Sequence, residues 1–300
     1  MAEAAAGAKL PCRLPSDIPK IVARMFVSRL ALIQGGPNAV VAWPLRLLYR
    51  LYERRLLSEV RGGPMPRHVG IILDGNRRYG EQQGIRDTRK IYGIGADKLD
   101  EVLDWCVELE IPAVTLWAFS TDNQLRAPDE VSGILAAIEE KLRRLARDPQ
   151  IHRRRVRVRA VGRIGRLPDP LIAAVREAER ATAGFQGTCL TIAVAYGGRD
   201  EIVDAMRGLL AARLAAGDTL DRAIDAITAE AIGKHLYSAD LPDPDLIIRT
   251  SGEARLSGFL LWQSVYSEFY FSDVYWPAFR KVDFLRAIRS FQQRDRRYGL

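Results

Sequence analysis

From Arg67 onward, short apolar runs alternate with stretches of helical spacing, and this alternation constrains the fold more than any other feature. A continuous apolar run bounded by polar residues is typical of a strand buried on both faces of a parallel sheet. Such runs predict strands at 69–73, 113–119, 156–161, 189–195, 245–249 and 268–271. Helical spacing occurs at 96–109, 131–146, 168–183, 200–216 and 283–296. The chain is therefore predicted to be an α/β protein with a central, mostly parallel sheet flanked by helices.

The first 66 residues differ from the rest of the chain. Their Ala-rich start predicts disorder, and residues 43–60 carry leucines at helical spacing with arginines between them. Glycines and prolines at 62–66 then indicate a boundary. We expect an N-terminal extension at 1–66, partly disordered and then helical, followed by a catalytic domain at 67–300. Two interpretations of the helix stay open: it packs on the domain, or it lies on an anionic membrane surface.

The net charge of +8, from 45 basic and 37 acidic residues, favours an anionic partner. Residues 152–159 (HRRRVRVR) resemble a nucleic-acid patch, but alternating Arg and Val is typical of a strand with one polar face. We therefore expect no nucleic-acid partner and favour anionic lipid or a phosphorylated substrate.

The location is expected to be cytoplasmic. The three cysteines are scattered, which fits a reducing compartment. No stretch approaches the roughly 18 apolar residues of a membrane span, and no secretory signal is recognisable at the N-terminus. A basic helix at 43–60 would add peripheral contact with the inner face of the cell membrane.

Candidate ligands follow the first predicted strand, because sheets of this kind bind ligands beyond the carboxyl ends of their strands. Asp74 offers carboxylate oxygens that suit a hard divalent cation. Gly75 allows close approach of the backbone to an anion, and Arg77 and Arg78 suit phosphate. The alternative is an ordinary helix cap.

Three further polar groups follow or interrupt later strands. Residues 120–123 (STDN) are either ligands or a local cap. Residues 249–257 contain Arg249, Arg255 and hydroxyl side chains around a glycine, and they form either a diphosphate cradle or an exposed polar loop. Glu268 lies in an aromatic run, so it is either paired or metal-bound, or it faces solvent.

Several common site patterns are absent from the sequence. It has no GxxxxGK[ST] loop, no GxGxxG after a strand and no DDxxD pair, and its three histidines are far apart. These absences argue against a nucleotide-binding loop, against the all-helical class of prenyl synthases and against a His-based metal centre.

Five ordered segments resemble the signatures of the cis-prenyltransferase family, which includes undecaprenyl diphosphate synthases. They are HVGIILDGNRR (68–78), FSTDN (119–123), YGGR (196–199), the block at 243–277 and RYG (297–299). The resemblance covers residues 66–300. It implies a dimeric α/β transferase that uses Mg²⁺ to condense isopentenyl diphosphate with an allylic diphosphate, geranyl or farnesyl diphosphate, into a Z-polyprenyl diphosphate.

The resemblance also implies a role for each matching residue. Asp74 and Glu268 would hold Mg²⁺, with Asn76 and Ser120 near the reacting centre. The residues expected at the allylic substrate are Gly75, Arg77, Arg78, Tyr79, Asn123 and Arg126. Those expected at the diphosphate of isopentenyl diphosphate are Arg249, Arg255 and Ser257. Arg297 and Gly299 would reach the site of the partner subunit in a homodimer.

Departures from the family pattern bear on the product. Tyr79 replaces a common Trp, Tyr92 lies in a segment that lacks a family histidine, and Gln124 replaces an aromatic. Such changes resemble the actinobacterial short-chain branch, which makes Z-farnesyl diphosphate, so we favour a short or medium product. The small Ala118 beside the expected apolar tunnel, walled by the second strand and residues 131–146, leaves a long-chain decaprenyl or undecaprenyl synthase open. A non-catalytic subunit of a heteromeric enzyme is the third alternative.

Overall fold

The computed structural model describes residues 39–294. The contacts within the chain divide it into two units, Met1–Arg54 and Arg55–Leu300. Helix α2 (Ala39–Arg61) confirms the helix predicted at 43–60. The expected disordered start, Arg297 and Gly299 lie outside the described residues, and the boundary at residue 66 stays a prediction. In the described part of the chain, no helix is long and apolar enough to cross a membrane.

A six-stranded sheet forms the centre of the second unit, in the order β3-β4-β2-β1-β5-β6, and every neighbouring pair is parallel. Its strands are β1 (His68–Ile72), β2 (Ala113–Ser120), β3 (Arg157–Val161), β4 (Cys189–Tyr196), β5 (Leu246–Arg249) and β6 (Glu268–Phe271). Each coincides with a predicted strand to within two residues at either end. Every residue of β1, β4 and β5 is buried, which explains why their sequences are almost uninterruptedly apolar.

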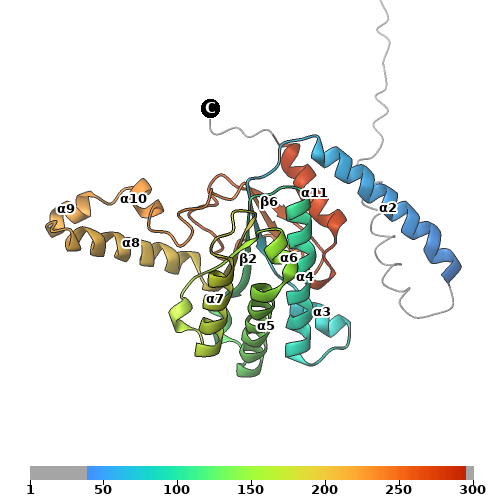
Figure 1. Cartoon of the computed structure of the whole chain (residues 1–300), viewed down its shortest axis with the longest axis horizontal. Helices are drawn as coiled ribbons and strands as arrows, with labels where there is room; N and C mark the ends of the chain where they lie inside the picture. The colour runs from blue at the N-terminus through green and yellow to red at the C-terminus, as the bar shows by residue number, and fades with distance from the viewer. Residues whose placement is uncertain (1–38, 295–300) are drawn as a thin grey trace, which may run out of the picture. The chain divides into compact units, whose positions relative to one another are not determined.

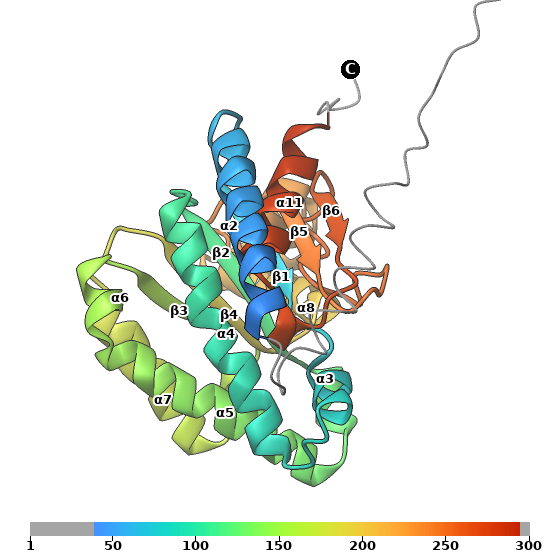
Figure 2. The same ribbon diagram turned by 90° about the vertical axis from the view of Figure 1, so that its right-hand side faces the viewer.

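Helices cover both faces of this sheet. On one face lie α4 (Thr88–Glu108), α5 (Pro128–Arg147), α7 (Asp169–Thr182) and α11 (Lys281–Gln292), while α8 (Gly198–Ala215) lies behind the sheet in Figure 2. The second face is also packed by Phe259 and Leu260, which join a buried cluster with Trp117 and Tyr196. The expected arrangement of a parallel sheet between helices is therefore confirmed (Figure 1).

Short helices complete the unit. They are α3 (Asn76–Gln82), α6 (Pro149–Arg153), α9 (Leu220–Asp225), α10 (Ala229–Gly233), and the 3₁₀ turns Asp122–Leu125, Ile164–Arg166 and Trp276–Ala278. Helices α9 and α10 lie between α8 and β5 along the chain. One or two turns are too short for hydrophobic spacing to define the ends of a helix.

The register of the central strands positions the candidate site. Ile72, the last residue of β1, lies opposite Trp117 of β2 and Arg249 of β5. Because the strands are parallel, the segments that follow them emerge at the same edge of the sheet. Asp74, Ser120 and Arg249 are therefore brought to one edge although up to 175 residues separate them along the chain.

We expect Leu116→Ala, in the middle of β2, to destabilise the protein by about 3 kcal/mol, because the side chain is 1% exposed and its removal leaves a cavity. Urea unfolding would measure the change. Leu125→Ala is the matched control, since Leu125 is 89% exposed and its loss should cost less than about 0.5 kcal/mol. Equal effects of the two substitutions would contradict the placement of β2 in the core.

Candidate active site

The backbone around Asp74 is tied to the segment that follows β5. The Asp74 N–H donates a hydrogen bond to Thr250 Oγ1 at 3.0 Å, and the Thr250 hydroxyl lies 2.7 Å from the Asp74 carbonyl oxygen. That carbonyl also accepts from the Trp276 N–H at 3.0 Å. Two segments that are distant from Asp74 in sequence thus fix its position.

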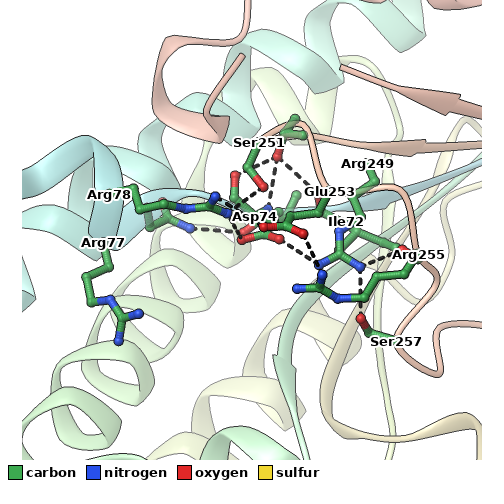
Figure 3. A network of polar contacts seen from close by, with 12 residues as sticks. Ile72, Asp74, Arg77, Arg78, Arg249, Ser251, Glu253, Arg255 and Ser257 are labelled. Carbon is green, nitrogen blue, oxygen red and sulfur yellow. Dashed lines mark hydrogen bonds and ion pairs between the residues drawn. The ribbon is translucent and has the colours of Figure 1, made fainter. Parts of the chain in front are cut away.

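The Asp74 carboxylate lies between two guanidinium groups (Figure 3). Arg249 Nη2 donates to its Oδ2 at 2.7 Å and Arg78 Nη2 donates to its Oδ1 at 3.3 Å. Burial alone would raise the pKa of Asp74, but the hydrogen bond and charge of Arg249, with help from Ser251 and Arg78, outweigh it and hold the pKa below its usual range. The carboxylate is therefore ionised at neutral pH.

Gly75 connects this carboxylate to helix α3. Its φ is 99°, a conformation that favours glycine, and an added Cβ would lie 2.7 Å from the Tyr275 ring. Gly75, rather than Asp74, is the N-cap of α3, and no side chain caps the helix. The capping alternative for Asp74 is therefore wrong, because its side chain accepts hydrogen bonds from Arg78 and Arg249 instead.

Arg249 is only 5% exposed, and its donors are partly used. Its Nη1 donates to the Arg255 carbonyl oxygen at 2.5 Å and to Ser257 Oγ at 2.8 Å. Its Nε is buried without a hydrogen-bond partner. Thr250 and Ser251 are also buried, so the alternative of an exposed loop is wrong for the first half of this segment. Buried polar groups without a hydrogen-bond partner are rare in folded proteins, and they often mark a functional site.

Arg78 is held on the other side of Asp74. It donates to Ser251 Oγ at 2.8 Å and to Glu253 at 3.3 Å, and its guanidinium lies 5.5 Å from the centre of the Tyr275 ring. Stacking and two directed hydrogen bonds restrict this side chain, so it is oriented toward Asp74 before any ligand binds.

Ser120 and Asn123 stabilise the end of β2 together. The Ser120 N–H donates to Asn123 Oδ1 and the Asn123 N–H donates to Ser120 Oγ, each at 3.0 Å. The local-cap alternative therefore holds for these two residues. Both still line the cavity that contains Asp74, so their capping role and a place beside the substrate are compatible.

Three hydrogen-bonded side chains at another side of the site join α4 to α5. Arg126 donates to Glu130 at 2.7 Å and to the Tyr92 hydroxyl at 3.1 Å, and that hydroxyl donates to Glu130 at 2.8 Å. Burial, with the neighbouring Glu130 carboxylate, raises the pKa of Tyr92, so Tyr92 keeps its proton. Glu130 was not predicted as a site residue, and no local sequence pattern indicates it.

These groups surround one cavity of about 550 Å³. Five arginines line it, Arg77, Arg78, Arg126, Arg249 and Arg255, against three carboxylates, Asp74, Asp122 and Glu253. The excess of two positive charges suits a strongly anionic ligand such as a diphosphate. Gly75, Asn76, Ser120, Asn123 and Ser257 complete the predicted residues in this lining.

Two predicted residues lie elsewhere. Tyr79 is partly buried on α3 and does not line the cavity. Glu268 begins β6 opposite Leu246, at the amino end of the strands, and is paired with Arg294. Asp74 follows the carboxyl end of β1, so a single chain does not bring Glu268 to Asp74.

The residues around Asp74 allow a test of the expected magnesium. Among residues 39–294, no group of three or more His, Cys, Asp or Glu side chains could hold a metal by itself. Mg²⁺ is commonly bound by one or two carboxylates together with substrate phosphates and water. Asp74, an ionised carboxylate inside a diphosphate-sized ring of arginines, fits that kind of site.

Comparison with known proteins decides the family. The model described as "Putative undecaprenyl diphosphate synthase" matches residues 72–299. The chain belongs to this cis-prenyltransferase family. It is 56% identical over 249 residues to the isoprenyl transferase of Deinococcus radiodurans, covering 83% of this chain and 90% of the relative. It is 49% identical over 252 residues to the (2Z,6E)-farnesyl diphosphate synthase of Thermobifida fusca, covering 84% and 97%.

A solved cis-prenyltransferase structure agrees with the fold. Lavandulyl diphosphate synthase from Lavandula x intermedia, in complex with dimethylallyl diphosphate, superposes with a TM-score of 0.71 at 33% identity, covering 79% of this chain and 99% of that chain. The resemblance read from five sequence segments is confirmed, and with it the reaction class, cis-prenyl chain elongation on isoprenyl diphosphates.

We expect Asp74→Ala to reduce turnover by about 100-fold or more, because removing a preorganised charged group at the reacting centre has effects of that size. Initial rates with purified protein would measure the loss, and circular dichroism would check the fold. Asp122→Ala removes another carboxylate of the same cavity and should change turnover less than about tenfold. Wild-type turnover in Asp74→Ala would contradict the role assigned to Asp74.

Proposed function

We propose that this protein uses Mg²⁺ to condense isopentenyl diphosphate with geranyl or farnesyl diphosphate, giving a Z-polyprenyl diphosphate of short or medium length. The observation that carries the proposal is the arginine-lined cavity around Asp74, which continues into an apolar slot. The diphosphate head group of a prenyl substrate suits the arginine-lined cavity, and its hydrocarbon tail suits the apolar slot beside it.

The arginines suggest two diphosphate subsites, one on each side of Asp74. Arg77 and Arg78 lie on one side, and Arg249, Arg255 and Ser257 lie on the other (Figure 3). We assign the first group to the allylic diphosphate and the second to isopentenyl diphosphate. Bound phosphate would take over donors that now serve Asp74, which frees that carboxylate for a cation.

The chain's own side chains suit an ionisation mechanism. When the allylic C–O bond breaks, negative charge develops on the leaving diphosphate, and the guanidinium donors of Arg77 and Arg78 stabilise it. A bound Mg²⁺ would add further stabilisation of the same charge. Arg249 and Ser257 would hold the second substrate so that its double bond attacks the allylic carbon. The new Z double bond forms as a proton is lost, and the released diphosphate, which carries away the electrons of the broken C–O bond, can accept that proton. Asn76 and Ser120 border the space in which this carbon would lie.

The apolar slot agrees with the expected tunnel walls. It lies between α4, α5 and the sheet, and it shares Leu73, Asn76, Tyr92, Ala118 and Ile134 with the arginine-lined cavity. Its volume of about 50 Å³ is far below the roughly 300 Å³ at which ordinary ligand pockets begin. The slot must therefore widen to take any prenyl tail, and a short tail requires the smaller movement, in agreement with the likeness to a (2Z,6E)-farnesyl diphosphate synthase.

We further propose a cytoplasmic homodimer. Edge strand β6 carries the exposed Phe271, and Val265 just before it is also exposed, so an apolar surface borders the sheet edge. A second copy covering that edge would remove exposed strand groups. Glu268 and the segment with Arg297 and Gly299 would then serve a site only across such an interface.

Incubation with radiolabelled isopentenyl diphosphate, Mg²⁺ and either geranyl or farnesyl diphosphate tests the reaction, with products separated by chain length. We expect a single C15 product from geranyl diphosphate, because the slot has little space beyond the reacting centre. Omitting Mg²⁺, with a chelator present, should abolish the product.

Other outcomes of this assay identify the alternatives. A ladder ending near C50 to C55 would make the protein a carrier-lipid synthase and overturn the short-chain assignment. No product from either primer would favour a non-catalytic subunit. Asp74, Arg249 and Arg255 argue against that role, because a subunit without catalysis has no need of an ionised carboxylate among arginines.

We also propose that α2 binds anionic membranes, because its sequence alternates leucines with arginines. Full-length protein should float with vesicles that contain anionic lipid, and a version that starts at Pro66 should float at least several-fold less. Neutral vesicles are the control. Equal flotation of the two proteins would contradict the proposal and favour packing of the helix on the domain.

A further inference from the structure

The far end of the apolar slot carries one charged side chain. Beyond the residues shared with the arginine-lined cavity, its lining is almost entirely apolar, and the exception is Lys141 of α5. The apolar lining residues at this end include Leu99, Ala137, Ile138 and Ile192. A lysine is an unusual choice for a hydrocarbon-lined space, because its ammonium loses hydration when buried.

A partner on α4 compensates this burial. Lys141 is 4% exposed, and its ammonium donates to the Asp100 carboxylate, which is half exposed. Burial lowers the pKa of Lys141, and the hydrogen bond and charge of Asp100 oppose that shift. Breaking a buried pair leaves an uncompensated charge, so the lysine side chain is held in place by Asp100.

Lys141 also borders a second cavity on the outer side of the same helices. This surface cleft has a volume of about 720 Å³, and Asp100 and Lys141 both line it. Most of its other lining side chains are charged residues from α4 and α5, among them Arg89, Glu140 and Arg144. Because Lys141 lines both spaces, its side chain lies between the slot and the cleft.

We propose that the Lys141–Asp100 ion pair closes the far end of the slot and thereby limits the length of the prenyl chain. This inference rests on the proposed function and assigns a specificity-determining residue to it. A hydrocarbon that grows to this point meets a buried ammonium group that cannot move aside without losing its carboxylate partner. Past the pair, the chain would emerge into a charged, water-filled cleft.

The spacing along α5 gives the expected length. Ile134 lies where the slot meets the arginine-lined cavity, and Lys141 lies seven residues further, which is about 10 Å along a helix. One isoprene unit extends a chain by about 5 Å, since it adds four carbon–carbon bonds of roughly 1.5 Å each, inclined to the chain axis. The length from the reacting centre to Lys141 therefore matches about two units beyond the one that reacts, which corresponds to a C15 chain. Because the slot without a ligand holds only about 50 Å³, its walls must move apart to admit these units.

Lys141→Ala tests the proposal in the assay with labelled isopentenyl diphosphate and geranyl diphosphate. We expect the main product to lengthen by at least one isoprene unit, because the slot then opens into the cleft. Arg144→Ala is the matched control. Arg144 also bridges α5 to α4 through an ion pair, with Asp97, and lines the cleft but not the slot, so its loss should leave product length unchanged.

A second variant decides the matter if Lys141→Ala is poorly folded. Asp100→Ala keeps the lysine but releases it toward solvent, and it should also lengthen the product. If Lys141→Ala folds well and still gives the wild-type product length, the inference is overturned, while the proposed function stays intact. If Lys141→Ala does not fold, a wild-type product length in Asp100→Ala has the same meaning. Absence of product from the wild-type protein would instead remove the proposed function, and this inference with it.

Discussion

The ion pair between Asp74 and Arg249 is the interaction on which the site depends. A guanidinium as deeply buried as that of Arg249 requires a negative partner, and Asp74 supplies it from the neighbouring central strand. The same contact joins the ends of β1 and β5 and keeps the carboxylate ionised. One pair therefore fixes the ends of two strands relative to each other and places an ionised carboxylate among the arginines of the cavity.

The polar cavity and the apolar slot share one wall, and this shared wall sets the direction in which a substrate with a charged head and an apolar tail can lie. Asn76, Ala118 and Ile134 face both the arginine-lined cavity and the slot, so head group and hydrocarbon are sorted at a single boundary. In the function that we propose, charge holds the diphosphate end at the edge of the sheet, and exclusion of water favours the tail between α4 and α5. The reaction is confined to the boundary because only there do both preferences hold.

Much of this arrangement follows from the sequence. The four inner strands are recognisable because both of their faces are covered, and convergence of Asp74, Ser120 and Arg249 follows from parallel strand ends. Other features depend on contacts between distant segments, which spacing cannot show. Glu130 reaches Arg126 and Tyr92 through the packing of α5 on α4. Lys141 has the sequence signature of a surface residue, and only the packing of α4 on α5 places it in a slot.

The order of strands in the sheet has a consequence for synthesis of the protein. Strand β1 lies between β2 and β5, yet β5 is made about 175 residues after it. While a ribosome is translating the middle of the message, β1 has one unpaired edge and Asp74 lacks Arg249. The nascent chain is thus inert and prone to aggregate until its last fifth emerges. A chain that terminates before β5 would lack Arg249 and would therefore be inactive. The unpaired edge of β1 in such a chain is a surface that a chaperone could bind.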